Sequence, residues 1–291
     1  MMNKSFIASG ILCSLLMGIG MSNAIAQPSP PKVEATYGKG TKSFKLATGS
    51  PGELGLLQSL GEAFDKKEGA QLVWIKAGSG ASMNLLKTQQ VDMIMVHAPE
   101  AVKKAIAEGW ATDRTLIGSN EFYIVGPKND PAKIQSATSG ADAYAKISQS
   151  QSNFISRGDK SGTHQKEMDI WKKVGITPEG NWYIVTNDFM TASLKRANAE
   201  KAYFMTDSST WVAEKNIAPQ LQILYRGDPY LVNTYDALAA PVGATANRDV
   251  AVKFIQFVAS DEGQTIIRNY GKTQYKESLY NDATYAKQYV H

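Results

Sequence analysis

The ten residues "ISRGDKSGTH" at positions 155–164 bring together the groups that bind a small anion. A guanidinium gives two parallel hydrogen bonds to a tetrahedral oxoanion, and hydroxyl groups add further donors. Arg157, Ser161 and Thr163 are therefore candidate anion ligands. Asp159 has two interpretations. It either forms an ion pair that orients Arg157, or it accepts the proton of an anion such as hydrogen phosphate.

Two other turns offer similar donors, "TGSPGE" at 48–53 and "GSGAS" at 78–82. They supply Thr48, Ser50 and Ser79. Each turn joins a predicted strand to a predicted helix, and a helix N-terminus carries partial positive charge and unpaired N–H groups. A single turn of this kind is often an ordinary helix cap. Three of them converging on one point predict an anion site.

Strands and helices alternate along the chain, which favours parallel sheets with crossover helices. Predicted strands cover residues 44–48, 71–77, 91–97, 153–157, 182–186 and 202–206. Predicted helices cover residues 53–69, 81–90, 100–110, 163–175, 190–201 and, as a pair, 248–271. In such sheets ligands bind beyond the carboxyl ends of the strands, which is where the three turns lie.

Two long extended segments, 114–134 and 221–240, separate the alternating pattern into two groups. We therefore expect two lobes between which the chain crosses twice. Lobe 1 is expected to contain residues 44–122 and 236–291, and lobe 2 residues 123–235. Residues 27–43 are rich in Pro, Gly and Ser and are expected to form a flexible tether before the fold.

The first 26 residues have the pattern of a secretory signal peptide. Lys4 precedes an apolar run, and Ala24 and Ala26 place small residues before a cut at Gln27. We expect export to the periplasm and removal of this segment, with a retained membrane anchor as the alternative. The single cysteine, Cys13, lies inside it, so the mature chain has no thiol for metal binding or catalysis.

The overall charge argues against a nucleic-acid binder. The formal net charge is +4, and no dense run of Lys and Arg interleaved with aromatic residues occurs. We expect no nucleic-acid partner and a monomeric protein.

An exported hydrolase is a remote alternative. It would pair Ser161 or Thr163 with His164 and Asp159, but residues one to three positions apart do not face each other at a helix start. The chain has no Gly-x-Ser-x-Gly elbow. Its three histidines have no acidic helical partners for zinc. We therefore expect no catalytic residue, no metal site and no cofactor, and we expect His97 to end a strand and bond locally.

Several segments together resemble the tungstate-binding substrate-binding proteins of ABC transporters. The resemblance runs in order through "LATGSPGELGLL", "AGSGASM", "VDMIMVHAPE", "YIVGPKNDPA", "SRGDKSGTHQKEMDIW" and "AYFMTDSSTW". It implies an α/β, two-lobed type II periplasmic-binding-protein-like fold with two chain crossings. It also implies a tetrahedral oxoanion ligand, tungstate or molybdate, and an inner-membrane ABC permease as partner.

The resemblance implies that Thr48, Ser50, Ser79, Arg157 and Thr163 hold the oxoanion. The chain departs from the family pattern at its shorter "TGSPG" turn and at "NDFMTASL" (187–194).

The second departure places Asp188 and Phe189 where the family has a glycine-rich turn, so another small anion remains an alternative. Phosphate-binding proteins share Arg-x-Asp-x-Ser-Gly-Thr, matched by Arg157, Asp159, Ser161 and Thr163, and are the second hypothesis.

Overall fold

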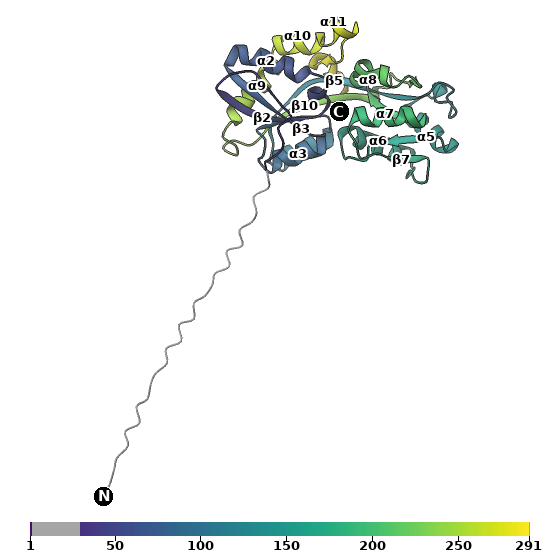
Figure 1. The fold of residues 1–291 in the computed structure, drawn as a ribbon, viewed down its shortest axis with the longest axis horizontal. Coiled ribbons are helices and arrows are strands. Elements are labelled where there is room, and N and C mark those ends of the chain that lie inside the picture. The colour runs from purple at the N-terminus through teal and green to yellow at the C-terminus, as the bar shows by residue number, and fades with distance from the viewer. Residues whose placement is uncertain (2–29, 291) are drawn as a thin grey trace. The chain divides into compact units, whose positions relative to one another are not determined.

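The computed structural model describes residue 1 and residues 30–290. Apart from its first residue, the predicted signal peptide lies outside the described residues. The chain from Pro31 onward forms one compact unit (Figure 1). Within the described part of the chain, no helix is both long enough and apolar enough to cross a membrane.

Strands and helices alternate through most of this unit. The strands are β1 (Ala35–Tyr37), β2 (Lys42–Thr48), β3 (Ala70–Lys76), β4 (Met93–Val96), β5 (Thr112–Pro127), β6 (Phe154–Ser156), β7 (Tyr183–Val185), β8 (Tyr203–Asp207), β9 (Leu221–Tyr225), β10 (Val232–Ala239) and β11 (Asn281–Asp282). The helices are α1 (Ser50–Glu53), α2 (Leu56–Glu68), α3 (Ser79–Lys87), α4 (Pro99–Ala107), α5 (Gly140–Ser150), α6 (Gly162–Val174), α7 (Met190–Glu200), α8 (Ser208–Glu214), α9 (Arg248–Ala259), α10 (Asp261–Asn269), α11 (Lys272–Tyr275) and α12 (Ala283–Ala286).

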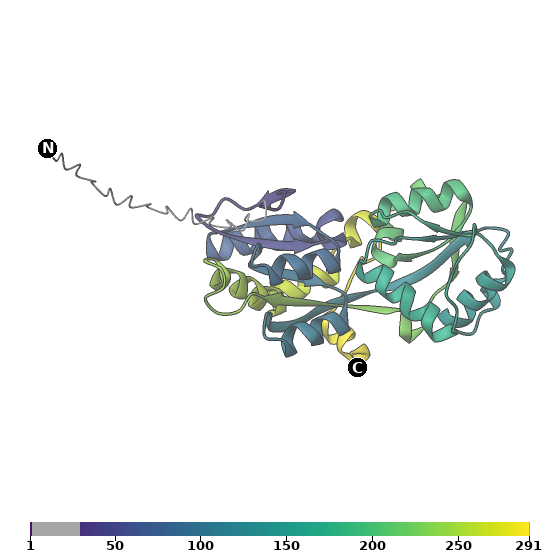
Figure 2. The same cartoon turned by 90° about the horizontal axis from the view of Figure 1, so that it is seen from below.

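The strands form a continuous sheet in the order β1-β3-β2-β4-β10-β5-β8-β6-β7, and β9 and β11 pair with β5 beside this path. β2 is parallel to β3 and β4, and β6 is parallel to β7 and β8. Between these parallel groups, β5 pairs with β10 through residues 112–121 and with β8 through residues 122–125. The chain thus passes between two α/β groups in β5 and returns in β10 (Figure 2).

Each α/β group has hydrophobic cores on both faces of its part of the sheet. Successive residues of a strand point to opposite faces. Leu46 packs with α2 and α9, whereas Ala47 packs with α3 and α4. In the second group, Phe154 and Ile155 divide between two cores in the same way. The two groups are the two lobes, and their dividing points at 122/123 and 235/236 stay a prediction.

The helix predicted at 53–69 forms as two helices, α1 and α2. Gly55 separates them with a φ of 85°, a left-handed conformation that glycine adopts at little cost. The Tyr270 hydroxyl donates to the Leu54 carbonyl at 2.5 Å and so satisfies the end of α1. Gly69 ends α2, as the sequence predicts.

The predicted tether at 27–43 extends too far, because the sheet already begins at Ala35. β1 is antiparallel to β3. Tyr37 lies over Gly61 of α2, where an added side-chain carbon would lie 3.0 Å from the Tyr37 Cβ. A three-residue edge strand is too short to show the alternation that predicts strands from sequence. Its pairing with β3 is a tertiary effect.

Four helices, α5, α8, α11 and α12, are missing from the sequence-based prediction. The start of α5 carries a recognisable capping signal, because the Ser139 hydroxyl accepts from the Asp142 N–H at 3.0 Å. The Asp142 carboxylate accepts in turn from the Thr138 N–H at 2.9 Å. Tyr144 and Ile147, three residues apart, are its buried face.

Candidate functional site

The three turns named by the sequence meet at one small cavity between the lobes. Five predicted site residues line it, Thr48, Ser50, Ser79, Arg157 and Ser161. The other lining residues are Gly49, Pro51, Glu53, Gly78, Met95, His97, Phe189 and Tyr235. The N-termini of α1, α3, α6 and α7 lie around the cavity, so their positive dipole ends surround it.

The first lobe supplies two hydroxyl groups that differ in whether their hydrogen is already donated within the protein. The Thr48 hydroxyl donates to the Met95 carbonyl at 2.9 Å, so its hydrogen is already engaged. The Ser79 oxygen accepts from the His97 N–H at 3.2 Å. Because Ser79 acts there as an acceptor, its own hydrogen remains available to an anion. Ser50 begins α1, where backbone N–H groups have no helical partner.

Arg157 comes from the second lobe and is only 4% exposed. Its Nε donates to the Asp188 carbonyl at 3.1 Å, and its Nη2 donates to Asp159 Oδ2 at 2.5 Å. Within the described residues, no hydrogen bond from its Nη1 occurs. Two fixed acceptors therefore hold the guanidinium in place while its remaining N–H groups can reach a ligand.

Asp159 does not line the cavity, and both of its oxygens are occupied. Oδ2 accepts from Arg157, and Oδ1 accepts from the Ser161 N–H at 3.1 Å. This geometry matches the interpretation in which Asp159 orients Arg157. The Ser161 hydroxyl caps α6 by accepting from the His164 N–H at 3.2 Å.

Thr163 is the predicted site residue that lies away from the cavity lining. Its side chain is 2% exposed, and its hydroxyl has no hydrogen-bond partner among the described residues. It is the second residue of α6, one position after Gly162. Its role as an anion ligand, which the family resemblance implies, stays a prediction.

His97 lines the cavity and was expected only to end a strand. Burial is the main cause that lowers the pKa of His97 to about 4; Arg157 and Lys166 act in the same direction, and the hydrogen bond with Asn233 and the charge of Asp159 act against it. Its ring stacks on Tyr235 with centroids 5.0 Å apart. The "VHAPE" motif at the end of β4 was the available signal, since strand ends are where ligands bind in such sheets.

The unusual 187–189 turn contributes one side chain to the cavity. Phe189 lines it, with the Arg157 guanidinium 5.9 Å from the ring centroid and the Lys76 ammonium 4.5 Å from it. The Asp188 side chain is exposed and is not part of the lining. Lys76 also pairs with Glu53 at 2.7 Å, which offsets the charge of that cavity carboxylate.

Three glycines bring the turns of the two lobes into contact. A side-chain carbon on Gly80 would lie 2.7 Å from the Lys160 carbonyl, and one on Gly162 would lie 2.5 Å from His97. One on Gly78 would lie 3.4 Å from Ser161. The lobes therefore touch beside the cavity at positions where Cβ atoms at Gly80 and Gly162 would clash.

The family model described as a PBP superfamily domain matches residues 31–262. The chain belongs to the PBP superfamily. A tungstate-binding protein from Peptoclostridium acidaminophilum is 32% identical, over 94% of this chain and 97% of that protein. The tungstate ABC transporter structure from Geobacter sulfurreducens is 36% identical with a TM-score of 0.72, over 80% of this chain and all of that one. A tungstate-binding protein structure from Desulfovibrio alaskensis is 32% identical with a TM-score of 0.69, over 83% of this chain and 98% of that one.

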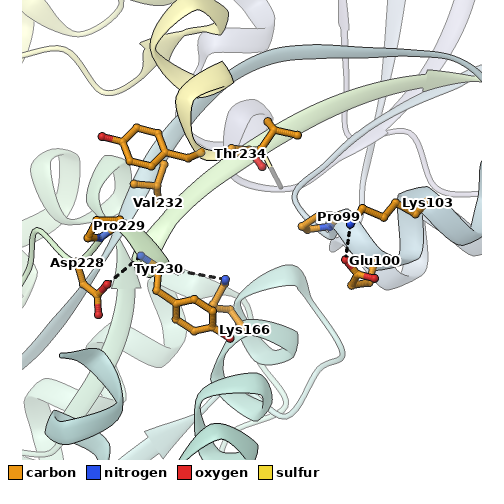
Figure 3. A pocket seen from close by; sticks show the side chains of 11 residues that line it. Pro99, Glu100, Lys103, Lys166, Asp228, Pro229, Tyr230, Val232 and Thr234 are labelled. Atoms are coloured by element: carbon orange, nitrogen blue, oxygen red, sulfur yellow. Dashed lines mark hydrogen bonds and ion pairs between the residues drawn. The ribbon is translucent and has the colours of Figure 1, made fainter.

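These findings confirm the predicted two-lobed, periplasmic-binding-protein-like fold. A second, more open hollow in this PBP-superfamily protein lies beside α4 and Tyr230 (Figure 3). Its charges are already satisfied locally. Lys103 pairs with Glu100 at 2.9 Å, Asp228 accepts from the Tyr230 N–H at 2.9 Å, and Lys166 donates to the Tyr230 carbonyl at 3.2 Å. It therefore lacks the convergent donors of the cavity at Arg157.

Proposed function

We propose that this protein is the substrate-binding component of an ABC importer and holds a tetrahedral oxoanion, tungstate or molybdate, in the cavity at Arg157. The observation that supports this most is that the buried guanidinium of one lobe and the Ser79 hydroxyl of the other line the same cavity, where the Ser79 hydrogen has no acceptor among the described residues. The names of the relatives support the same ligand class. The protein has no catalytic role in this proposal.

The donors are sufficient in number for tight binding. Hydrogen bonds to a charged acceptor contribute about 1.5–3 kcal/mol each. Five or six from Arg157, Ser50, Ser79, Ser161 and the helix N-termini would offset desolvation of the anion and leave the roughly 8 kcal/mol of micromolar affinity. Thr48 adds little as a donor in this arrangement, because its hydrogen is bound to Met95.

The phosphate hypothesis has less support from the geometry. It needs Asp159 to accept a proton from the ligand, yet Asp159 is not among the residues that line the cavity, and each of its oxygens accepts a hydrogen bond from the protein. We infer that Asp159 acts by positioning Arg157 and Ser161.

The proposal extends to location and partners. The protein acts outside the inner membrane as a monomer after loss of residues 1–26, and it delivers the anion to an ABC permease. N-terminal sequencing of the protein from a periplasmic fraction tests the first part, and Gln27 is the expected first residue. An intact Met1 would contradict export with cleavage.

A thermal-shift panel tests the ligand. Purified mature protein is heated with tungstate, molybdate, sulfate or phosphate, each at the same concentration. A ligand at a thousand times its Kd stabilises the folded state by about 4 kcal/mol, so tungstate and molybdate should raise the Tm. An unchanged Tm with all four anions would contradict the proposal, and a rise with phosphate alone would favour the second hypothesis.

A further inference from the structure

A chain of buried polar side chains connects His97 with the second lobe. His97 Nδ1 lies 3.0 Å from Asn233 Oδ1, and Asn233 Nδ2 lies 2.7 Å from Asn120 Oδ1. Asn120 Nδ2 then lies 2.8 Å from Ser209 Oγ and 3.1 Å from Asp207 Oδ1. This series of hydrogen bonds runs across β10, which contains Asn233, and β5, which contains Asn120; these two strands join the lobes.

Ser209, the last residue of this series of hydrogen bonds, determines the direction of every bond in the series. Ser209 donates its only hydroxyl hydrogen to the Leu279 carbonyl at 2.6 Å. A backbone carbonyl can only accept, so the Ser209 oxygen must accept from Asn120. The nitrogen of the Asn120 amide therefore faces Ser209, and its oxygen faces Asn233.

The orientations of the two asparagine amides determine which ring nitrogen of His97 carries a hydrogen. Asn120 Oδ1 needs a donor, so Asn233 presents Nδ2 to it and presents Oδ1 to His97. An amide oxygen can only accept, which means that His97 Nδ1 carries a hydrogen. In a neutral ring with hydrogen on Nδ1, Nε2 is an acceptor. Within the described residues, no hydrogen bond to Nε2 occurs.

The surroundings of His97 keep the ring neutral. The ring is partly buried and packs between Tyr235 of β10 and the start of α6 at Gly162. The charged groups that act on it are Arg157 and Lys166, which disfavour the imidazolium, and Asp159, which favours it. Burial outweighs the carboxylate, and the pKa of His97 falls to about 4.

We propose that His97 is a neutral hydrogen-bond acceptor of the anion cavity, so that the site takes its oxoanion together with one O–H group opposite Nε2. This rests on the proposed function of the cavity as an oxoanion site. The O–H group comes either from a retained water or from a protonated oxygen of the anion. A bare anionic oxygen against Nε2 would be repelled, which makes His97 a specificity-determining residue.

Histidine nitrogen NMR on the full mature chain, empty and with excess molybdate, tests the proposal. His164 supplies an internal contrast, because its Nδ1 accepts from the Lys160 N–H at 3.1 Å and its hydrogen therefore lies on Nε2. We expect His97 to carry hydrogen on Nδ1 alone in both states. An imidazolium, or hydrogen on Nε2 of His97, would overturn the proposal. The measurement on the empty protein stands even if no oxoanion binds, so it separates this inference from the proposed function.

Variants test whether Asn233 determines which ring nitrogen of His97 carries the hydrogen. Asn233→Leu removes the acceptor for Nδ1, and we expect part of the His97 population to move its hydrogen to Nε2. The exposed residue Asn181 gives the matched control, Asn181→Leu, for which no change is expected. If Asn233→Leu does not fold, His97→Leu carries the test through binding alone.

Calorimetry of His97→Leu separates the two sources of the O–H group. Loss of preference for hydrogen phosphate over sulfate would identify a protonated anion oxygen. An affinity change of tenfold or more that is equal for sulfate and molybdate would identify a retained water. Wild-type affinity for all of these anions would overturn the proposal.

Discussion

Arg157 carries the only full positive charge among the residues that line the cavity, and its carboxylate partner Asp159 lies outside the lining. Its side chain is 5% exposed. Truncation would leave the bound anion without its counter-charge in a buried site. Removing one partner of a buried charge pair costs several kcal/mol.

We therefore expect Arg157→Ala to lose about 3 kcal/mol of oxoanion binding free energy, roughly a hundredfold in Kd. Isothermal titration calorimetry with molybdate measures the loss. Arg196→Ala is the matched control, because Arg196 is half-exposed on α7 and pairs only with Glu200 at 2.9 Å. Equal affinities for the wild type and Arg157→Ala would place the site elsewhere.

Asp159→Asn separates the two roles considered for this carboxylate. If Asp159 orients Arg157 and Ser161, the change should weaken molybdate and phosphate binding alike, by about 1 kcal/mol or more, since one charge-assisted hydrogen bond becomes a neutral one. Competition titrations with both anions give the ratio of affinities. A selective loss of phosphate binding would instead assign Asp159 to the ligand's proton.

Among the helices and strands, the start of α6 packs tightly against the residue that follows β4. A methyl group on Gly162 would lie 2.5 Å from His97, and the backbone carbonyl of His97 blocks its movement. We expect Gly162→Ala to weaken oxoanion binding by about 1–3 kcal/mol, because overpacking a tight contact has this cost. Calorimetry measures it.

The Tm of empty Gly162→Ala is the control for this variant. It should change less than the binding free energy, since separated lobes relieve the contact. Unchanged affinity would mean that this contact is not needed in the bound state.

Helix α6 also buries a carboxylic acid, Glu167, against β6 and β7. Its Oε1 accepts from the Tyr183 hydroxyl at 2.6 Å and from the Trp171 indole at 3.3 Å. Burial raises the pKa of Glu167 from 4.5 to about 7. Between pH 4.5 and 7, the folded state therefore holds a proton that the unfolded chain releases. The contribution of Glu167 to folding stability is complete below pH 4.5 and is lost as the pH rises through 7.

We expect Glu167→Gln to remove this pH dependence, because the amide oxygen can accept the same two hydrogen bonds without ionising. The wild type should lose about 3 kcal/mol more stability than the variant between pH 4.5 and 7. Urea unfolding at both pH values measures the difference, and the comparison cancels the opposite contribution of His97. Parallel pH profiles for the two proteins would contradict the shift.

In the molecule as a whole, β10 and β5 are the strands through which the sheet continues from one lobe to the other. Such a junction allows hinge motion about a few residues. Anion binding should shift the population toward the arrangement in which the turns touch, since that arrangement adds the donors of the second lobe.

We therefore expect the radius of gyration in solution to fall when molybdate is added. Small-angle X-ray scattering of the wild type measures this, and Gly162→Ala should show a smaller decrease. An identical radius with and without saturating molybdate would argue for a cavity that is closed in both states.

Local sequence patterns predict the alternation of strands and helices and the three donor-rich turns. These features are local, because they depend on apolar spacing and on Gly, Ser and Thr at strand ends. These patterns therefore place Thr48, Ser50, Ser79, Arg157 and Ser161 at strand-to-helix turns, and the structure brings all five to one cavity.

Which atoms of those residues are available to a ligand depends on contacts that form only in the folded chain. The engagement of Thr48 with Met95, the Nε contact of Arg157 with the Asp188 carbonyl and the hydrogen-bond chain behind His97 all involve partners distant in sequence, up to 136 residues away. Hydrogen-bond direction depends on where each donor finds an acceptor in space, and local sequence patterns do not encode this. For the same reason, the edge strand β1 and the exposed position of Asp188 became visible only in the folded chain.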